Sequence, residues 1–238
     1  MKRMTDEQLE ELRKFDTPTI CNAIESFGVR SNTEGYMGPE IRCILPFSKP
    51  VVGYAVTGKI SAQSPPSEEQ KKLVTMHYKN LCKFEGLKIA VLEDIDPEPL
   101  GSFWGGVNTS IHMVFNCNSV ITNGGVRDLK DAEEAGFAYF AKCVLVSHAN
   151  VHLTEVGSTV NIGGIEVEPG DLLHADIHGV VKIPEEVSGM LAEACREVIE
   201  AENFVIDRCR KRKGMGMDIE DLQALRRQMY QLRDRKRK

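Results

Sequence analysis

A mixed α/β fold is predicted for this chain of 238 residues, with mixed sheets flanked by helices in a single main domain. In the first half, short apolar runs alternate with helical patterns, as in units of strand, helix and strand. From residue 139 to residue 184, short apolar runs are separated by turn glycines, which is typical of an antiparallel β unit. These two patterns together predict the fold class.

Two helices are predicted at the N-terminus. Residues 5–8 read Thr-Asp-Glu-Gln, a capping box that opens a short helix. Thr17 followed by Pro18 predicts the start of a second helix, with Thr17 as its cap and Gly28 at its end. Residues 29–50 are rich in Gly, Pro and polar side chains and predict an irregular connection.

Strands and helices then alternate. Strands are predicted at residues 51–61, 88–93 and 119–122. One helix is predicted after residue 67, on the spacing of Leu73, Met76, Leu81 and Phe84, and another at about residues 107–115. A second capping box, at residues 67–70, marks the start of the first of these helices.

The C-terminal part is predicted to be helical. One long helix is expected over residues 184–213, and another over residues 219–232, which ends in a basic run. We therefore expect a catalytic domain over residues 1–213 and a basic helical extension over residues 214–238.

The composition excludes several classes of protein. A net charge of -5 gives no support to a general nucleic-acid binder. The chain has no run of 18 apolar residues, so no membrane span is predicted. The N-terminus lacks the apolar core of a signal peptide. Seven scattered cysteines, none in a C-x-x-C pair, are expected to be reduced. The composition indicates a cytoplasmic globular protein.

The most informative motif is the run Asn-Gly-Gly-Val-Arg-Asp at residues 123–128, which lies between a predicted strand and a helix that begins near Leu129. The two glycines are expected to let the backbone turn sharply and approach a ligand. Arg127 and Asp128 would then place a cation and a hard oxygen ligand at one strand-to-helix junction. This arrangement suits a small anion held beside a divalent metal ion.

Asp128 has two open interpretations. Its carboxylate can cap its own helix, with Asp131 in the first turn, or it can bind a metal ion. Arg127 and the glycines favour the second role, because capping requires neither. A single carboxylate suffices for Mg²⁺, which keeps several waters, whereas a structural zinc site needs a full ligand set.

Two further segments are candidate sites. If a helix begins within Trp-Gly-Gly-Val-Asn at residues 104–108, its free N–H groups can bind a carboxylate. The alternative is a buried Trp beside a glycine turn. Histidines 148 and 152, and histidines 174 and 178, would each share one face of a strand. Hydrogen bonding in the core, a subunit interface or a pocket wall is favoured for them over a zinc site.

These motifs together resemble one family. Gly-Gly-Val-Arg-Asp at residues 124–128, the upstream Trp104-Gly105, and the segment at residues 169–184 with its Pro-Gly-Asp start occur in this order. They are similar to the family of the regulator of ribonuclease E activity A (RraA) and the 4-hydroxy-4-methyl-2-oxoglutarate aldolases. The resemblance covers about residues 10–210. It implies a swivelling β/β/α fold, ring-shaped trimers, and a class II aldolase that uses Mg²⁺ or Mn²⁺.

The resemblance also implies roles for individual residues. Asp128 would bind the metal, and Arg127 would face the keto or enolate oxygen of a 2-oxo acid. The substrate carboxylate would lie on the backbone amides of four residues, namely Gly105, Gly106, Val107 and Asn108. A glutamate from the C-terminal helix of a neighbouring subunit is expected at the site, and Glu202 is our candidate, with Glu200 as the alternative.

Two positions depart from the family pattern. Many members have Glu where this chain has Gly106, and many have Asp where it has Asn123. The predicted function is cleavage of 4-hydroxy-4-methyl-2-oxoglutarate to pyruvate and decarboxylation of oxaloacetate. The alternative is a regulator without catalysis that binds an RNA-processing enzyme such as ribonuclease E.

Overall fold

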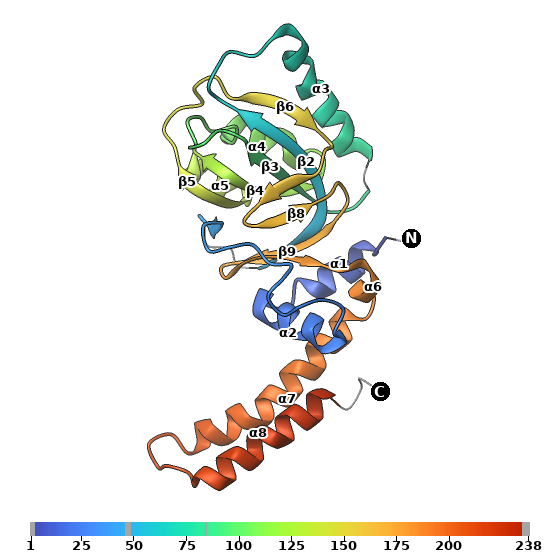
Figure 1. Cartoon of the computed structure of the whole chain (residues 1–238), viewed down its shortest axis with the longest axis vertical. Coiled ribbons are helices and arrows are strands. Elements are labelled where there is room, and N and C mark those ends of the chain that lie inside the picture. The colour runs from blue at the N-terminus through green and yellow to red at the C-terminus, as the bar shows by residue number, and fades with distance from the viewer. Residues whose placement is uncertain (1–2, 46–48, 84, 235–238) are drawn as a thin grey trace.

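Figure 1 shows the computed structural model, which describes residues 3–45, 49–83 and 85–234. A body of strands and helices lies at one end of the molecule, and the two C-terminal helices project from the other. The helices are α1 (Asp6–Leu12), α2 (Thr17–Phe27), α3 (Glu68–Lys83), α4 (Gly106–Met113), α5 (Leu129–Ala135), α6 (Glu185–Ser188), α7 (Leu191–Lys211) and α8 (Ile219–Asp234). The strands are β1 (Arg42–Cys43), β2 (Val51–Ser61), β3 (Lys88–Asp94), β4 (Cys117–Val126), β5 (Ala138–Val144), β6 (His152–Val156), β7 (Val160–Ile162), β8 (Ile165–Val167), β9 (Leu172–Asp176) and β10 (Gly179–Ile183).

The predicted mixed α/β class is confirmed. The main sheet has the order β1-β5-β4-β3-β2-β9-β10, and β6 pairs with the second half of β2. Strands β2, β3, β4 and β5 run parallel, while β1, β6, β9 and β10 each pair antiparallel with a neighbour. The carboxyl ends of β3, β4 and β5 therefore lie together at one edge of the sheet, where α/β proteins build their sites.

One strand departs from the prediction. We expected antiparallel pairing from residue 139 onward, and β6 to β10 confirm it, but β5 runs parallel to β4. The short helix α5 provides the crossover that this parallel pairing requires. Strand β5 lies between β4 and β1, and its first four residues are buried.

Aromatic side chains fill the core beside the carboxyl edge. Trp104, Phe137 and Tyr139 are fully buried, and their rings contact one another in sequence. They belong to an apolar cluster that includes side chains of β3, β4 and β5. A second cluster joins α1, α2 and α7 to β2 and β10. The edge that carries the candidate site is thus supported by rigid packing.

The two N-terminal helices begin at polar caps. In α1 the predicted capping box is confirmed, because Thr5 Oγ1 accepts from the Gln8 amide and Gln8 Oε1 accepts from the Thr5 amide. In α2 the cap is Asp16 and not Thr17, so our prediction is wrong by one residue. Asp16 Oδ1 accepts from the Thr19 amide at 2.9 Å, while Thr17 is buried.

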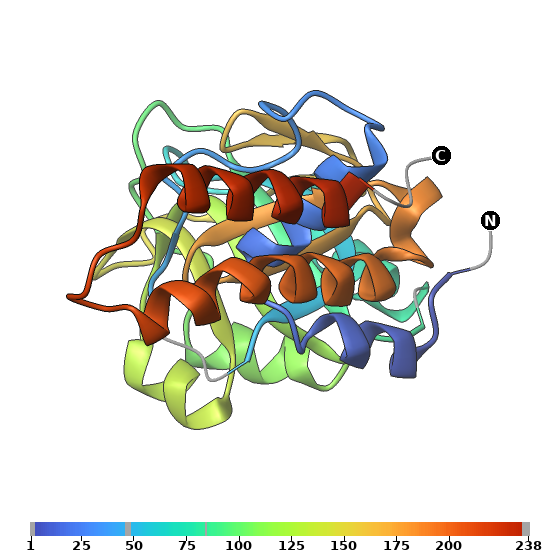
Figure 2. The ribbon, with the colours of Figure 1, turned by 90° about the horizontal axis from the view of Figure 1, so that it is seen from below.

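The predicted long helix over residues 184–213 is divided in two. Helix α6 ends before Gly189, and α7 begins two residues later. The start of α7 packs against α2, and α8 then runs back beside α7 (Figure 2). We call α7, α8 and the turn between them the arm. Residues 235–238 of the predicted basic extension lie outside the described residues.

No helix in the described part of the chain has both the length and the apolar character needed to cross a bilayer.

Candidate active site

The glycines of the central motif do not form a turn. Asn123, Gly124, Gly125 and Val126 are the last residues of β4, with a register shift after Thr122 where the strand pairs with β5. The predicted sharp turn is therefore wrong. The glycines are required for close packing: a Cβ on Gly124 would lie 2.8 Å from Asp94 Oδ2, and one on Gly125 would lie 2.5 Å from Leu145 Cδ1. The strand-to-helix junction comes later, at Arg127 and Asp128.

Asn123 joins the ends of two neighbouring strands. Its Oδ1 accepts from the Asp94 amide at 2.7 Å, and its Nδ2 donates to the Asp94 carbonyl oxygen at 2.9 Å. An ionised Asp at position 123 can accept the first bond but cannot donate the second. The departure from the family pattern at this position therefore has a structural role.

Asp94 is a buried carboxylate at the end of β3. Its residue is 4% exposed, and Oδ2 has no hydrogen-bond partner among the described atoms. Burial raises the pKa of this carboxyl to about 6, although Lys142 and the Asp96 amide act in the opposite direction. A carboxyl with a pKa shifted toward neutral pH, close to the motif, is the kind of group that active sites contain.

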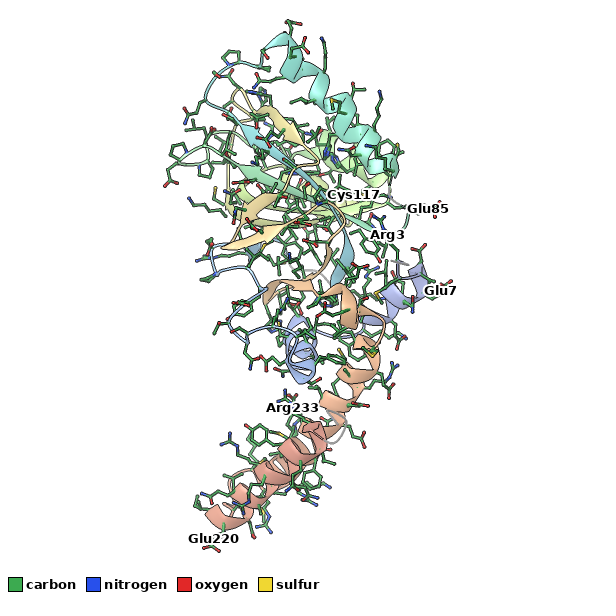
Figure 3. The ribbon with its side chains drawn as sticks, turned by 45° about the vertical axis from the view of Figure 1, so that its right-hand side comes forward. Arg3, Glu7, Glu85, Cys117, Glu220 and Arg233 are labelled. Carbon is green, nitrogen blue, oxygen red and sulfur yellow. The ribbon has the colours of Figure 1, made fainter. Side chains whose placement is uncertain are left out.

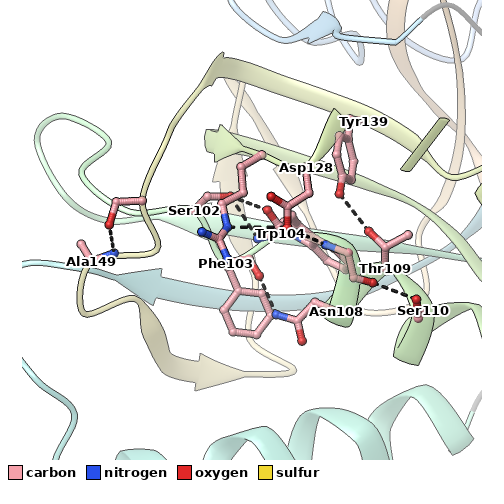
Figure 4. A network of polar contacts seen from close by, with 12 residues as sticks. Ser102, Phe103, Trp104, Asn108, Thr109, Ser110, Asp128, Tyr139 and Ala149 are labelled. Carbon is pink, nitrogen blue, oxygen red and sulfur yellow. Dashed lines mark hydrogen bonds and ion pairs between the residues drawn. The ribbon is translucent and has the colours of Figure 1, made fainter. Parts of the chain in front are cut away.

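Asp128 does not cap its own helix. It lies in the left-handed region at φ 56° and precedes α5, but its side chain makes no cap hydrogen bond there. Its Oδ2 accepts from the Gly106 amide at the start of α4, at 2.9 Å (Figure 4). Arg127 Nε lies 3.8 Å from the same oxygen, and each of the two side chains is about one-third exposed. The carboxylate therefore bridges two elements and stays open to solvent.

The N-terminus of α4 faces this carboxylate. Gly105 takes the cap position without a side-chain hydrogen bond, and the helix begins at Gly106. The first amides of a helix have no partner within it, so those of Val107 and Asn108 stay open to a ligand, while that of Gly106 is bonded to Asp128. The Asn108 side chain is directed away, because its Nδ2 donates to the Phe103 carbonyl oxygen.

Two carboxylates occupy the space beside the paired glycines. A Cβ on Gly105 would lie 2.5 Å from Asp128 Oδ2, and a Cβ on Gly106 would lie 2.7 Å from Asp131 Oδ2. A side chain at position 106, such as the glutamate that the resemblance implies, would require the exposed Asp131 carboxylate to move. The second departure from the family pattern is therefore coupled to an acidic residue in α5.

A buried histidine pair supports α4 from behind. His112 Nδ1 lies 2.7 Å from the Asn108 carbonyl oxygen, and its Nε2 lies 2.9 Å from His77 Nε2. Because the carbonyl only accepts, His112 donates through Nδ1 and accepts from His77 through Nε2. Burial lowers the pKa of His77 to about 3 and that of His112 to about 4, so both rings are neutral near pH 7.

The other predicted histidines are not grouped at the motif. His174 is buried in β9 and hydrogen-bonded to Thr17, which confirms the expected core role. His178 lies in the turn before β10, so the prediction that it shares a strand face with His174 is wrong. His148 is exposed in a loop, and His152 starts β6. Across the described residues, no group of three metal-ligating side chains occurs.

The predicted glutamate lies far from the motif within one chain. Glu202 is on α7, where its Oε1 accepts from Asn22 Nδ2 at 3.1 Å. Glu200 is exposed on the same helix. The fold thus unites Arg127, Asp128 and the start of α4, but it does not bring Glu202 to them within one copy.

Sequence reasoning missed Asp94 and Asp131 as members of the site. Asp94 ends a predicted strand, and parallel pairing with β4 would have placed it beside Gly124. Asp131 follows Asp128 by three residues, a spacing that puts both on one side of the first helical turn. The signal for Asp94 depended on which strands pair, whereas that for Asp131 was a local helical spacing.

The donor set fits a divalent cation that prefers oxygen. Asp128 is accessible, carries one hydrogen bond on Oδ2, and lies beside Asp131. Mg²⁺ and Mn²⁺ accept one or two protein carboxylates together with waters and substrate oxygens. Among the described residues, no three His, Cys, Asp or Glu side chains form a ligand group, which does not match a closed zinc site.

Comparison with known proteins identifies a family and a relative that cover most of the chain. The family model RraA-like, described as Aldolase/RraA, matches residues 17–182. An uncharacterised protein of Methanocaldococcus jannaschii, MJ0644, is 26% identical over 224 residues, which cover 93% of this chain and 96% of that protein.

Two solved structures share the fold. Streptomyces coelicolor RraAS2, described as an unusual member of the RraA family of RNase ES inhibitors, has a TM-score of 0.69 and 18% identity, over 87% of this chain and all of that one. A protein described as a cellulase from gut-associated microbes has a TM-score of 0.72 and 20% identity, over 85% of this chain and 88% of that one. At these identities the likeness shows the fold alone.

Proposed function

Because this chain belongs to the RraA-like (Aldolase/RraA) family, we propose that it is a divalent-metal-dependent lyase that cleaves C–C bonds of small 2-oxo acids. The reactions would be those of 4-hydroxy-4-methyl-2-oxoglutarate aldolase and oxaloacetate decarboxylase. One observation carries the proposal: the Asp128 carboxylate is not bonded to its own helix and stays accessible beside Arg127 and the start of α4.

The metal would be held by Asp128, with Asp131 close enough to bind one of its waters. When bound, a divalent ion supplies Lewis-acid stabilisation of negative charge on the substrate's keto oxygen. The Gly106 amide would keep Asp128 in position, because its hydrogen bond to Oδ2 fixes the rotation of the carboxylate.

The substrate would be oriented by α4 and Arg127. Its carboxylate would accept hydrogen bonds from the open amides of Val107 and Asn108, where the helix dipole favours an anion. Its keto oxygen would face Arg127, so that the guanidinium lies where charge develops as the C–C bond breaks. The electron pair of that bond would pass into the enolate of pyruvate. The other fragment would leave as CO₂ from oxaloacetate, or as a second pyruvate when the 4-hydroxyl group of the aldol substrate gives its proton to a water. The enolate would then take a proton on carbon.

A neighbouring copy would complete the site. We propose that the protein is a homotrimer or a higher oligomer, and that Glu202 of one copy enters the site of the next and directs the proton to the enolate. Residues 1–213 would form the catalytic domain and residues 214–238 a basic extension.

The proposal is tested by pyruvate release from oxaloacetate and 4-hydroxy-4-methyl-2-oxoglutarate, in the presence of Mg²⁺, Mn²⁺ or excess chelator. Asp128→Ala is expected to lose at least about 100-fold in kcat/KM and to bind Mn²⁺ weakly by calorimetry. The matched control is Glu134→Ala, which removes an exposed carboxylate on the same helix and should keep both activity and Mn²⁺ binding.

Other outcomes would overturn the proposal. Full activity in chelator or in Asp128→Ala would exclude a metal held at this residue. No pyruvate from either substrate, together with capture of an RNA-processing enzyme such as a ribonuclease, would favour the regulator without catalysis.

A further inference from the structure

A cavity of about 540 Å³ lies away from the candidate active site. It is bounded by the residues before α1, the end of α2, strand β2, the turn before β9 and the start of α6, and we call it the α6 cavity. Its volume is in the range of sites that bind small molecules. Neither Arg127 nor Asp128 lines it, so it can take a different ligand.

The register of β2 and β3 separates the α6 cavity from the candidate active site. Tyr54 lines the cavity and pairs with Lys88, the first residue of β3. The candidate site lies beyond Asp94, the last residue of β3, and the strand rises about 20 Å between Lys88 and Asp94. In Figure 3, Arg3 of the cavity lies in the same part of the body as Cys117, the first residue of β4. The α6 cavity is therefore at the amino ends of these strands, and the candidate site is at their carboxyl ends.

Arg30 places a partly buried cation in the α6 cavity. Helix α2 ends at Gly28 in the left-handed conformation, and the chain then turns so that Arg30 Nη1 donates to the Lys182 carbonyl oxygen at 2.6 Å. Burial lowers the pKa of this guanidinium, while Cys21 and Glu34 act in the opposite direction. Arg30 forms no ion pair with any described residue, and a guanidinium has further N–H groups to donate. A carboxylate can accept two parallel hydrogen bonds from such a group, which makes it the preferred partner.

The other basic residues of the α6 cavity already have partners. Lys182 Nζ donates to Asp171 Oδ2 at 3.0 Å and to the Glu166 carbonyl oxygen at 2.9 Å. The Arg3 guanidinium lies over the ring of Tyr54, with Cζ 4.8 Å from the ring centroid. Among the described residues that line the cavity, Arg30 is therefore the cation that lacks a charged or aromatic partner.

Two carboxylates line the α6 cavity from its helix. Glu185 and Glu186 are exposed in the first turn of α6, and neither side chain has a hydrogen bond or an ion pair with a described residue. They would repel a simple anion, and Arg30 would repel a simple cation. The cavity therefore matches a ligand that carries one charge of each sign.

The surface beside these charges is apolar. Leu172 is 6% exposed and Ile183 is 3% exposed, and both line the cavity. Val29 and Pro184 extend the same lining. An aliphatic or aromatic group placed there would be removed from water, which favours binding. The ligand therefore needs an apolar part as well as the two charges.

We propose that the α6 cavity binds a free α-amino acid with an apolar side chain. The carboxylate of this ligand is held by Arg30, and its ammonium group faces Glu185 and Glu186. Its side chain lies on Leu172 and Ile183. An α-amino acid carries all three features on one carbon atom, so it can meet the three parts of the cavity together. This binding does not depend on the proposed lyase reaction.

Isothermal titration calorimetry of the full chain tests the proposal with three probes, L-leucine, L-methionine and L-phenylalanine. At least one of them should bind. The tightest probe is then compared with two analogues that keep its side chain, one without the ammonium group and one without the carboxylate. For leucine these analogues are 4-methylpentanoate and 3-methylbutylamine. Each analogue should bind at least about tenfold more weakly, because each leaves one charge of the cavity unpaired.

Two variants assign the charges. Arg30→Gln should weaken binding of the tightest amino acid at least about tenfold. Glu185→Gln combined with Glu186→Gln should weaken it by a similar factor. The analogue without the ammonium group should bind this double variant at least as tightly as it binds the wild type, because the repelling carboxylates are gone. Both glutamates are exposed, so the double variant keeps the proposal testable if Arg30→Gln fails to fold.

Matched controls remove the same charges elsewhere. Arg42→Gln replaces an exposed arginine that also donates to a backbone carbonyl oxygen, that of Pro39. Glu68→Gln with Glu69→Gln removes two exposed carboxylates from the first turn of α3. Asp128→Ala removes the carboxylate of the candidate active site. All three controls should bind the amino acid with wild-type affinity.

Several outcomes would overturn the proposal. They are no binding of any probe, equal affinity for an analogue that lacks one charge, and wild-type affinity in the double variant of α6. Loss of binding in Asp128→Ala would also overturn it, because the amino acid would then occupy the candidate active site. Since lyase activity is not measured, failure here leaves the proposed function to its own test.

Discussion

Two regions of the molecule differ in how tightly they are packed. One is the edge of the sheet that carries Asp128, and the other is the arm. Behind the edge, aromatic rings are fully buried and α4 is tied down by a chain of hydrogen bonds through His112 and His77. On the arm, Leu225 is the only residue of α8 that is buried among those described. The edge is therefore held by packing from several elements, whereas α8 is stabilised mainly by its packing along α7, whose first half is packed on the body.

This difference shows how each part is stabilised and in which part an ionisable side chain can be buried. The rigid edge holds a carboxyl that burial keeps hard to ionise, and it keeps Asp128 in a left-handed conformation that costs free energy. The arm has no such strain, but it exposes apolar surface. Four substitutions sharpen the comparison.

The largest expected effect is on the edge. Trp104→Ala removes a fully buried indole that contacts His112 and Phe137, and should lower the free energy of unfolding by about 3 to 5 kcal/mol. Because Trp104 is the only tryptophan, urea unfolding should be followed by circular dichroism. A loss below about 1 kcal/mol would show that the edge is not tightly packed.

Gly105→Ala should act on the site more than on stability. The backbone of Gly105 is extended at φ -156°, which any residue adopts, but the new Cβ would lie 2.5 Å from Asp128 Oδ2. Displacing that carboxylate should weaken Mn²⁺ binding and lower kcat/KM by roughly 10- to 100-fold. Gly189→Ala, where the added Cβ meets open space, is the control. Unchanged Mn²⁺ affinity would show that Asp128 does not bind the metal ion.

Asp94→Asn should stabilise the protein in a pH-dependent manner. The pKa of Asp94 is raised from 3.8 to about 6, so its ionisation opposes folding. The penalty is absent below about pH 4, grows between pH 4 and 6, and is complete above pH 6. At pH 7 the variant should gain roughly 1 to 3 kcal/mol, and at pH 4 almost nothing. Equal stability at both pH values in chemical unfolding would contradict the shifted pKa.

The smallest effect is expected on the arm. Leu225→Ala should change the free energy of global unfolding by less than about 1 kcal/mol, because the arm opens locally before the body unfolds. Amide hydrogen exchange in α8 should accelerate at the same time, and exchange in β3 and β4 should not. A global loss as large as that of Trp104→Ala would mean that the arm belongs to the main cooperative unit.

Local signals placed many elements correctly. Both capping boxes, at residues 5–8 and 67–70, begin helices as predicted, because these bonds form within four residues. The strand at residues 51–61 has the predicted bounds, since β-branched and aromatic residues recur along its whole length. Such features depend on neighbours in the chain, and the sequence contains all of them.

The predictions were wrong or incomplete where a residue's conformation or contacts depend on segments that are distant in sequence. The glycines at residues 124 and 125 predicted a turn, but Asp94 and Leu145 approach them so closely that glycine is needed within a strand. Asp128 was left open between capping its own helix and binding a ligand, and the structure adds a third partner, the amide of Gly106. None of these partners is near in sequence.

The sequence by itself determined the α/β class, the two capping boxes and the motif in which Arg127 and Asp128 are adjacent. Only the tertiary structure decided that Asp94 and Asp131 join this motif, that Asn123 and Gly106 accommodate them, and that Glu202 lies elsewhere in the same chain. The reason is that periodicity and capping act over a few residues, whereas the pairing order of strands sets which carboxylates meet.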